Sequence, residues 1–182
     1  MLEEVIIAGF GGQGVLSMGQ LMAYAGMLEG KNVSWIPSYG PEMRGGTANC
    51  GVTISDEKIS SPVVTEPSCA IIMNRPSLDK FEPAVKSGGL ILVNSSLIDQ
   101  EVKRTDVTSY MVPANDLAAE LGNDKVANII LLGVYIELTG ALSIDSIIES
   151  LKKVLPERRH NLIPLNRQAL EKGAEFVHKV KK

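Results

Sequence analysis

A glycine-rich turn near the start of the chain is the clearest feature that could do chemistry. Gly9–Gly14 reads Gly-Phe-Gly-Gly-Gln-Gly, which fits the GxGxxG pattern of dinucleotide-binding folds. Glycine permits positive φ and close backbone approach, and a helix beginning after the turn would point free N–H groups at an anion. The turn therefore predicts a phosphate or pyrophosphate site at Gly11, Gly12, Gln13 and Gly14. A tight turn that serves chain packing alone is the alternative.

A second segment rich in glycine and polar residues follows the next expected strand. Its candidate binding residues are Ser38, Tyr39, Gly40, Pro41, Glu42, Arg44, Gly45 and Gly46. After a parallel strand, such a loop lies at the carboxyl edge of the sheet, where ligands bind in open α/β folds. The guanidinium of Arg44 suits a phosphate or carboxylate group. A surface pair between Glu42 and Arg44 that only orders the loop is the alternative.

The glycine turn alone would suggest a nicotinamide-dependent enzyme. A dinucleotide fold also needs an acid about twenty residues further on, which holds the ribose. The expected second strand ends Trp35-Ile36-Pro37-Ser38 and offers no acid, so the NAD hypothesis is weakened. Arg44 could instead hold a 2′-phosphate. An NAD(P)-binding Rossmann protein and a structural scaffold whose glycine turns merely pack are therefore the two alternative functions.

The glycine turn sits inside an expected strand–helix–strand unit. Val5–Ala8 is a short apolar run typical of a buried strand. Val15–Leu28 carries a helical apolar stripe and is followed by Gly30, a residue typical of the position just after a helix C-terminus. Val33–Ile36 predicts the next strand. A strand–helix–strand crossover joins two parallel strands and is almost always right-handed, so these elements are expected to begin a parallel sheet.

The rest of the chain continues the α/β pattern. We expect a hairpin of Thr47–Ile54 with Lys58–Ser61, followed by strands at Cys69–Met73, Leu90–Asn94 and Thr108–Val112. Expected helices are Pro76–Lys86, Asp116–Leu121 capped by Asp116, Val126–Leu138, Ser143–Val154 capped by Ser143, and Pro164–Val180. The sequence thus predicts one Rossmann-like domain over residues 1–182, with a mostly parallel sheet flanked by helices and one β-hairpin.

The segment Val126–Leu138 is apolar on nearly every face. Such a helix is either buried in the core or covered by a partner, and if exposed it would favour a homodimer of the isolated chain. Asn128 lies near its start. It is either a hydrogen-bonded core amide or cap, or a polar contact to the two glycine-rich loops.

Composition excludes several classes of function. The net charge of -3 and the lack of a basic stripe give no footprint for nucleic acid. Cys50 and Cys69 are too few for a cubane iron–sulfur cluster and are expected to be buried free thiols. The most apolar stretch is too short to span a membrane, and no secretory pattern opens the chain. We expect a cytoplasmic protein. Arg158-Arg159-His160 is expected in a solvated turn, and a contact of this segment with a phosphate at an edge is the alternative.

Three segments together resemble a known family. The Gly11–Gly14 turn, the Ser38–Gly46 loop and Asn128–Gly133 are similar, in order and spacing, to the gamma subunit of 2-oxoacid:ferredoxin (acceptor) oxidoreductases. The resemblance extends over essentially the whole chain, and the tyrosine–proline–arginine–glycine loop is its most specific part. It implies that the two loops and Asn128 contact a ligand phosphate or another subunit.

The resemblance also implies a division of labour. Such enzymes oxidatively decarboxylate a 2-oxoacid to an acyl-CoA and pass the electrons to ferredoxin or a similar acceptor. Thiamine diphosphate, Mg and the iron–sulfur clusters sit on other subunits or domains of the complex, and the implied partners are alpha and beta subunits, with or without a delta subunit. The gamma subunit contributes to the coenzyme A side of the site, and alone it is expected to bind no cofactor and to be inactive. The loop sequence favours 2-oxoglutarate, or a branched 2-oxoacid, over pyruvate.

Overall fold

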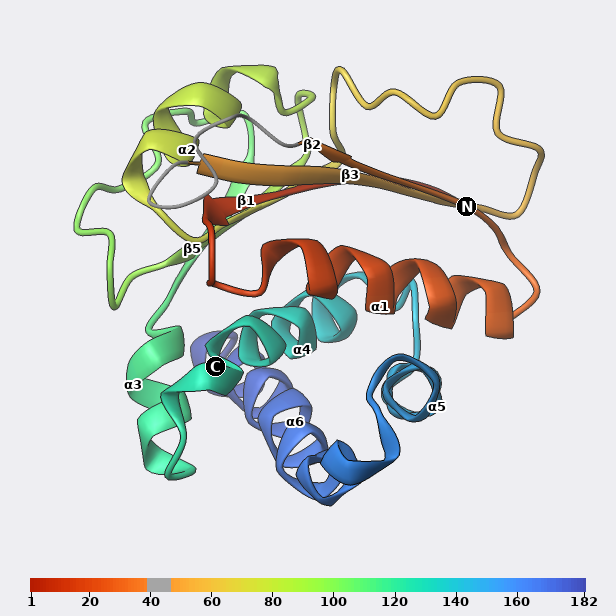
Figure 1. Ribbon diagram of the computed structural model, residues 1–182. Coiled ribbons are helices and arrows are strands. Elements are labelled where there is room, and N and C mark those ends of the chain that lie inside the picture. Colours follow the sequence, from red (N-terminus) through yellow and green to blue (C-terminus); the bar gives the residue numbers. More distant parts are fainter. Residues whose placement is uncertain (39–46) are drawn as a thin grey trace.

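The fold is built on one mixed sheet with helices on both faces (Figure 1). The computed structural model describes residues 1–38 and 47–182, and within them six strands lie in the order β2-β3-β1-β4-β5-β6. The strands are β1 (Leu2–Phe10), β2 (Asn32–Ser38), β3 (Thr47–Ser55), β4 (Cys69–Ile72), β5 (Leu90–Asn94) and β6 (Thr108–Val112). The pairs β1–β4, β4–β5 and β5–β6 are parallel. The predicted mostly parallel α/β fold is confirmed.

The antiparallel part of the sheet differs from the predicted hairpin. Strand β3 pairs with β1 on one side and with β2 on the other, both antiparallel. Both of its hydrogen-bonding edges are therefore occupied, and residues 58–61 form no strand. The consecutive antiparallel pair is β2 with β3. Since β2 and β1 run in the same direction, the predicted crossover is present, but β3 lies between its two strands.

Most of the helical mass covers one face of the sheet. The helices are α1 (Val15–Leu28), α2 (Arg75–Phe81), α3 (Ala114–Glu120), α4 (Ala127–Thr139), α5 (Ile144–Val154) and α6 (Ile163–Val180). Short 3₁₀ turns are η1 (Glu82–Ala84), η2 (Asp124–Val126) and η3 (Glu157–Leu162). In Figure 1, α1, α4, α5 and α6 lie below the sheet and α2 lies above it. In the part of the chain that the structure describes, no helix is long and apolar enough to cross a membrane.

Two predicted helix boundaries need correction, and one cap is confirmed. The Ser143 hydroxyl accepts a hydrogen bond from the backbone N–H of Ser146 at 3.1 Å, which is the predicted cap of α5. Helix α3 begins at Ala114, so Asp116 lies in its first turn and does not cap it. Helix α2 ends at Phe81 and gives way to η1, because Pro83 has no N–H for the α-helical ladder.

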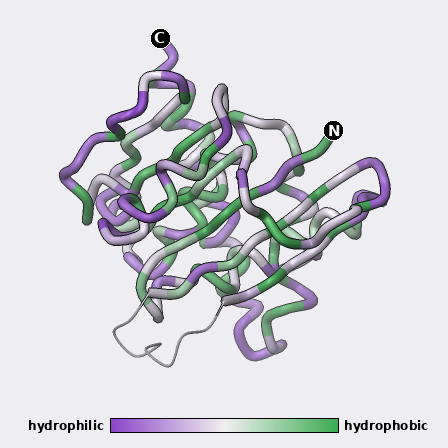
Figure 2. The backbone as a smooth tube through the Cα atoms, turned by 90° about the horizontal axis from the view of Figure 1, so that it is seen from above, coloured by the Kyte–Doolittle hydropathy of each residue, from purple (hydrophilic) through white to green (hydrophobic). Residues whose placement is uncertain are grey.

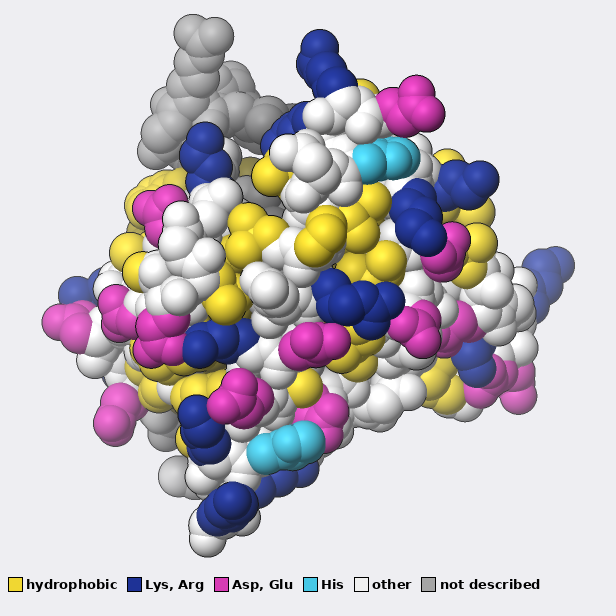
Figure 3. All heavy atoms as spheres, turned by 90° about the horizontal axis from the view of Figure 1, so that it is seen from below, with side chains coloured by type: hydrophobic (Ala, Val, Ile, Leu, Met, Phe, Trp, Pro, Cys, Tyr) yellow, Lys and Arg dark blue, Asp and Glu magenta, His cyan; other side chains and the backbone are white. Residues whose placement is uncertain are grey.

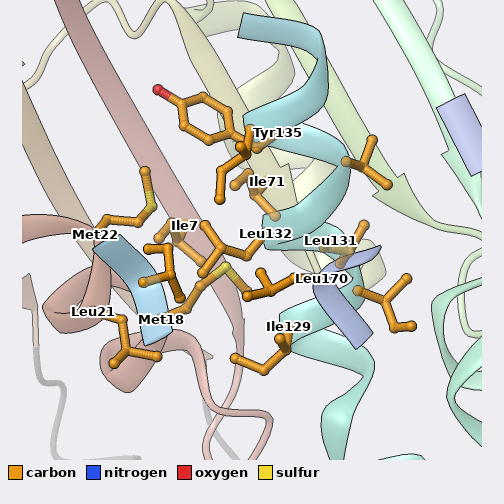
Figure 4. Packing of buried hydrophobic residues seen from close by; sticks show 14 of the residues in the cluster. Ile7, Met18, Leu21, Met22, Ile71, Ile129, Leu131, Leu132, Tyr135 and Leu170 are labelled. Atoms are coloured by element: carbon orange, nitrogen blue, oxygen red, sulfur yellow. The ribbon is translucent and has the colours of Figure 1, made fainter. Parts of the chain in front are cut away.

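Strand alternation divides the core into two layers. Ile7 of β1 faces the layer shared with α1, α4 and α6, whereas Ile6 and Ala8 face the smaller layer under α2. Figure 4 shows Met18 of α1 and Leu132 of α4 pointing toward Ile7 in the larger layer. Seen from above, hydrophobic segments run through the middle of the molecule and hydrophilic ones lie around it (Figure 2). The core is almost wholly aliphatic, as the low aromatic content requires.

Helix α4 is the centre of the larger layer. Every residue from 127 to 136 is buried. A Cβ added at Gly133 would overlap the carbonyl group of Leu170, and one at Gly173 would overlap that of Ile130, so the backbones of α4 and α6 touch. Of the two possibilities considered, burial in the core of the chain and cover by a partner, burial in the core is the one observed. Its apolar surface is covered by the chain itself, so the exposed apolar helix that would favour a homodimer is not present.

Candidate functional site

The glycine turn lies at a point where the chain leaves neighbouring parallel strands toward opposite faces of the sheet. After β1 the chain turns down into α1, and after β4 it turns up into α2 (Figure 1). Ligands in open α/β sheets bind in the crevice that such a divergence creates. The residues that border it are Gly12, Gln13 and Gly14 on one side and Met73 on the other.

The turn has a conformation that only glycine adopts without strain. Gly12 has φ of 92° and Gly14 has φ of 75°. Gly14 is also the N-cap of α1, and a Cβ on it would overlap the Asn128 side chain. A Cβ on Gly9 would lie 2.5 Å from Oε1 of Gln13 and 2.7 Å from Cβ of Met73. The glycines are therefore required by geometry, and the turn presents its backbone rather than side chains.

Gln13 braces the turn from inside. Its Oε1 accepts a hydrogen bond from the backbone N–H of Phe10 at 2.6 Å. Its Nε2 donates to the carbonyl oxygen of Met73 at 3.2 Å. Both ends of the amide are thus used within the chain, and they join the end of β1 to the residue after β4. Gln13 holds the crevice in shape, while the backbone of Gly12 and Gly14 is left to meet a ligand.

Asn128 connects the turn to the core helix. Its Nδ2 donates to the carbonyl oxygen of Gly14 at 3.2 Å, and the residue is only 9% exposed. Asn128 combines the two predicted roles, because it is a hydrogen-bonded buried amide and also contacts the first glycine-rich loop. The pair spans 114 positions of the chain, so it ties the site to α4 directly.

The electrostatics of the turn favour an anion. The N–H groups of Val15, Leu16 and Ser17 come before the first helical hydrogen bond, from Met18 N–H to the Gly14 carbonyl oxygen at 3.0 Å, so they have no acceptor within α1. The first turn of α1, which the structure describes in full, carries no acidic side chain. The positive end of the helix dipole therefore meets no negative charge on its own helix turn, and Asp124 is the acidic side chain among the described residues that line the adjoining cleft.

A cleft of about 640 Å³ opens beside the turn. That volume lies within the usual range for small-molecule sites, roughly 300 to 1,000 Å³. The glycine turn forms one wall and the ends of α5 and η3 form another. Its lining residues are Gly12, Gln13, Gly14, Ser17, Leu21, Met73, Asn115, Asn123, Asp124, Lys125, Val126, Ala127, Asn128, Ile129, Leu151, Val154, Leu155, Arg159, Leu162, Leu165 and Asn166.

The second predicted loop begins and ends at the same sheet edge. Ser38, Asn49 and Ala8 form one row across β2, β3 and β1, and Thr47 pairs with Phe10 at the end of the ladder. Ser38 is exposed. The other residues predicted for this loop lie outside the described part of the chain: Tyr39, Gly40, Pro41, Glu42, Arg44, Gly45 and Gly46.

Sequence patterns missed part of the cleft. Arg159 is exposed in η3, as expected for a solvated turn, and it also lines the cleft together with Asn166. These residues come from the last third of the chain, and no motif links them to the glycine turn. The only available signal was the break in helical pattern at Pro156–Asn161, which marks a place where the chain can bend back toward the sheet.

The geometry argues against a dinucleotide-binding enzyme and an iron–sulfur site. In a dinucleotide fold the first two strands are neighbours, but here β3 separates β1 from β2. Cys50 and Cys69 are buried free thiols. Burial raises the pKa of Cys50 to about 12 and that of Cys69 well above its usual value, which disfavours the thiolates that bind metals. Among the described residues, no group of His, Cys, Asp and Glu could hold a metal ion.

Comparison with known proteins identifies the family. The model of the family described as pyruvate ferredoxin/flavodoxin oxidoreductase matches residues 4–176. The chain belongs to this family. The resemblance drawn from the two glycine-rich loops and the Asn128 segment is thereby confirmed.

Relatives within the family carry names for different 2-oxoacids. The chain is 42% identical over 179 residues to the ketoisovalerate oxidoreductase subunit VorA of Methanothermobacter marburgensis, covering 97% of this chain but only 37% of that protein. It is 34% identical to the 2-oxoglutarate synthase subunit KorC of Methanocaldococcus jannaschii, covering 97% of this chain and 95% of that protein. The chain thus spans little more than a third of the VorA relatives and nearly all of the KorC relative.

Solved structures share the fold. The gamma subunit of a keto/oxoacid ferredoxin oxidoreductase from Geobacter sulfurreducens matches with a TM-score of 0.80 at 30% identity, covering 95% of this chain and 96% of that one. A 2-oxoglutarate:ferredoxin oxidoreductase from Magnetococcus marinus, solved with 2-oxoglutarate, coenzyme A and succinyl-CoA bound, matches with a TM-score of 0.85 over 96% of this chain and 31% of that one. At 23% identity, the second likeness speaks for the fold alone.

Proposed function

We propose that this chain is the gamma-type subunit of a 2-oxoacid:ferredoxin oxidoreductase and that its cleft forms the coenzyme A side of the active site. The observation that carries the proposal is the glycine turn at the divergence of β1 and β4. It points the free N–H groups of α1 into a cleft of about 640 Å³. Family membership supports the reaction class.

The cleft suits the chemistry of coenzyme A. This substrate carries phosphates next to a long arm that is partly apolar and ends in a thiol. The positive end of α1 favours the phosphates, and among the charged side chains that line the cleft Lys125 and Arg159 outnumber Asp124. Apolar residues such as Leu151, Leu155 and Leu162 line the same cleft and can take the arm. The role of this chain is then to bind and orient the thiol donor and to exclude water from it.

The redox and carbanion chemistry falls to partner subunits in this proposal. The two cysteines are buried in the core and protonated, which makes them unsuitable as cluster ligands. Thiamine diphosphate, when bound to a partner with Mg, supplies the carbanion stabilisation that follows decarboxylation. Alpha and beta subunits, with or without a delta subunit, would complete the enzyme and pass the electrons to ferredoxin or a similar acceptor.

We propose 2-oxoglutarate or 2-oxoisovalerate as the substrate, ahead of pyruvate, because relatives similar to this chain are named for those two acids. The cleft residues described above do not contact the 2-oxoacid in this proposal. The choice of acid is therefore expected to follow the partner subunits.

The test is reconstitution with the partner subunits. The complete complex should reduce a viologen dye in a manner that depends on both a 2-oxoacid and coenzyme A, and the isolated chain should be inactive. Each of the three acids is assayed as the sole substrate. Full activity of a complex that lacks this chain would overturn the proposal. Tight binding of NADPH by the isolated chain, in calorimetric titration against coenzyme A, would favour the dinucleotide alternative.

A further inference from the structure

The wall of the cleft that faces the glycine turn combines apolar side chains with a few polar ones, as ligand-binding sites do. It is formed where α5 ends, η3 crosses over and α6 begins. Apolar side chains make up most of this wall, and Arg159 and Asn166 interrupt them. Figure 3, which looks at the helical side from below, shows hydrophobic side chains reaching the surface in the middle of this face, with Lys and Arg side chains around them.

Two buried asparagine side chains line the cleft, and in each of them the amide nitrogen donates to a backbone carbonyl oxygen. Asn128 is 9% exposed and Asn166 is 8% exposed. Nδ2 of Asn128 donates to the Gly14 carbonyl oxygen at 3.2 Å, and Nδ2 of Asn166 donates to the Leu162 carbonyl oxygen at 2.8 Å. Because a carbonyl only accepts, the nitrogen of each amide must face it, which fixes where each Oδ1 points.

The Oδ1 atoms of these two amides are acceptors without a donor. Nothing in residues 1–38 and 47–182 donates a hydrogen bond to either of them. Both atoms remain open to the cleft, since the fully buried side-chain polar atoms without a partner in these residues are Trp35 Nε1, Thr53 Oγ1, Asn74 Nδ2 and Ser77 Oγ. Both residues line the cleft, so the cleft presents acceptors to a ligand that carries N–H groups.

Arg159 adds a positive charge to the same wall. Within the described residues its guanidinium takes part in no ion pair, and its backbone N–H donates to the Pro156 carbonyl oxygen at 2.8 Å. Nε2 of His160 lies 2.9 Å from the Leu155 carbonyl oxygen and pins the turn against the end of α5. Lys125 and Asp124 line the cleft from η2. A fixed turn with an unpaired arginine suits an anionic group.

We propose that Asn128, Asn166 and Arg159 form a subsite for the amide-bearing arm and a phosphate of coenzyme A, across the cleft from the glycine turn. The proposal rests on the proposed function and extends it to the far wall. The secondary amides of the arm donate to the two Oδ1 atoms, and its apolar parts pack on Leu151, Val154 and Leu155. Arg159 binds a phosphate oxygen through charge-assisted hydrogen bonds.

The first test uses the reconstituted complex with Arg159→Met or Asn166→Leu. Loss of a charge-assisted contact should raise KM for coenzyme A about tenfold in Arg159→Met, and loss of a neutral acceptor about fivefold in Asn166→Leu. In both variants KM for the 2-oxoacid should stay within about twofold, a tolerance set by the scatter of single contacts. Arg158→Met is the matched control, because Arg158 is exposed and does not line the cleft.

A second measurement does not depend on variants that fold. Hydrogen exchange of the wild-type complex, with and without coenzyme A, should show slower exchange in residues 157–166 when coenzyme A is bound. Absence of this protection, or an unchanged KM for coenzyme A in the folded variants, overturns the subsite. The variant Gly12→Asn separates the two ideas. If it alone raises KM for coenzyme A, the proposed function stands without the subsite, and if all three variants leave KM unchanged, both are wrong.

Discussion

Nδ2 of Asn128 lies 3.2 Å from the carbonyl oxygen of Gly14 and donates a hydrogen bond to it. This contact joins the helix at the centre of the core to the turn from which α1 begins. It is also the reason why residue 14 must be glycine, since a Cβ there would overlap the asparagine. The position of the glycine turn is therefore set by the core, and substitutions on either side should change stability and, in the proposed function, ligand binding.

Asn128→Leu should lower the free energy of unfolding by about 1–2 kcal/mol, because it removes a largely buried hydrogen bond and leaves its acceptor with one partner fewer. Ser17→Ala is the matched comparison, since the Ser17 hydroxyl donates to the same Gly14 oxygen at 3.1 Å but is exposed. Its loss should be clearly smaller. Urea unfolding followed by circular dichroism measures both. Equal losses of unfolding free energy in the two variants would mean that the buried Asn128 hydrogen bond stabilises the fold no more than the exposed Ser17 one.

Gln13→Leu should destabilise the chain by about 1–3 kcal/mol, because it leaves the Phe10 N–H and the Met73 carbonyl without their side-chain partner. The same change at Gln20, which has no side-chain hydrogen bond within the described residues, controls for the chemistry of the substitution on α1. Thermal unfolding compares the two. If Gln20→Leu proves as costly as Gln13→Leu, the bracing role of Gln13 is wrong.

Gly133→Ala should cost about 3 kcal/mol or more, at the upper end for overpacking, because the new methyl group meets the backbone of α6 and backbone atoms cannot move aside as a side chain does. Glu171→Ala on the exposed side of α6 serves as the control and should change stability by no more than about 0.5 kcal/mol. Denaturant titration gives both values. A wild-type-like Gly133→Ala protein would show that the α4–α6 contact is looser than described.

The Arg104–Asp106 pair predicts a specific acid response. Nε and Nη2 of Arg104 bind the two carboxylate oxygens of Asp106 at 2.9 and 2.6 Å, and these hydrogen bonds lower the pKa of Asp106 from 3.8 to about 2. A carboxyl whose pKa is lower in the folded state stabilises the fold above its unfolded pKa, and this stabilisation is lost as the pH falls through the folded pKa.

Asp106→Asn removes this titration. The difference in stability between wild type and Asp106→Asn should therefore be constant above about pH 4 and shrink between about pH 4 and pH 2. The pair is partly exposed, so the effect is modest and best measured at low salt. Equilibrium unfolding at a series of pH values tests it. Parallel curves for the two proteins down to pH 2 would contradict the assignment.

Much of the fold was predictable because its signals are local. Continuous apolar runs located β4 and β5, and helical periodicity together with Gly30 located α1. The partner of β3 was not predictable in this way. Its sequence is compatible with a hairpin on its C-terminal side, and the pairing with β1 and β2 depends on contacts between distant segments.

The candidate site was predictable only in part for the same reason. The glycine turn follows from its pattern, and the contact of Asn128 with it was among the roles considered. A phosphate contact of Arg159 was only the less favoured alternative and Asn166 was not found, because a cleft wall contributed by η3 and α6 leaves no mark in the spacing of residues near the turn. That Gln13 braces the crevice, rather than facing a ligand, also required the three-dimensional contacts.

The most direct test of the central claim is the steady-state kinetics of the reconstituted complex with Gly12→Asn in this chain. Gly12 has positive φ, which asparagine tolerates better than most residues, and an added Cβ meets no atom within 4 Å. The new side chain would stand at the cleft beside the N-terminus of α1. Our account predicts that KM for coenzyme A rises about tenfold or more, the effect of about 1.4 kcal/mol of lost binding, while KM for the 2-oxoacid is nearly unchanged. An unchanged KM for coenzyme A in a folded, assembled complex would contradict it.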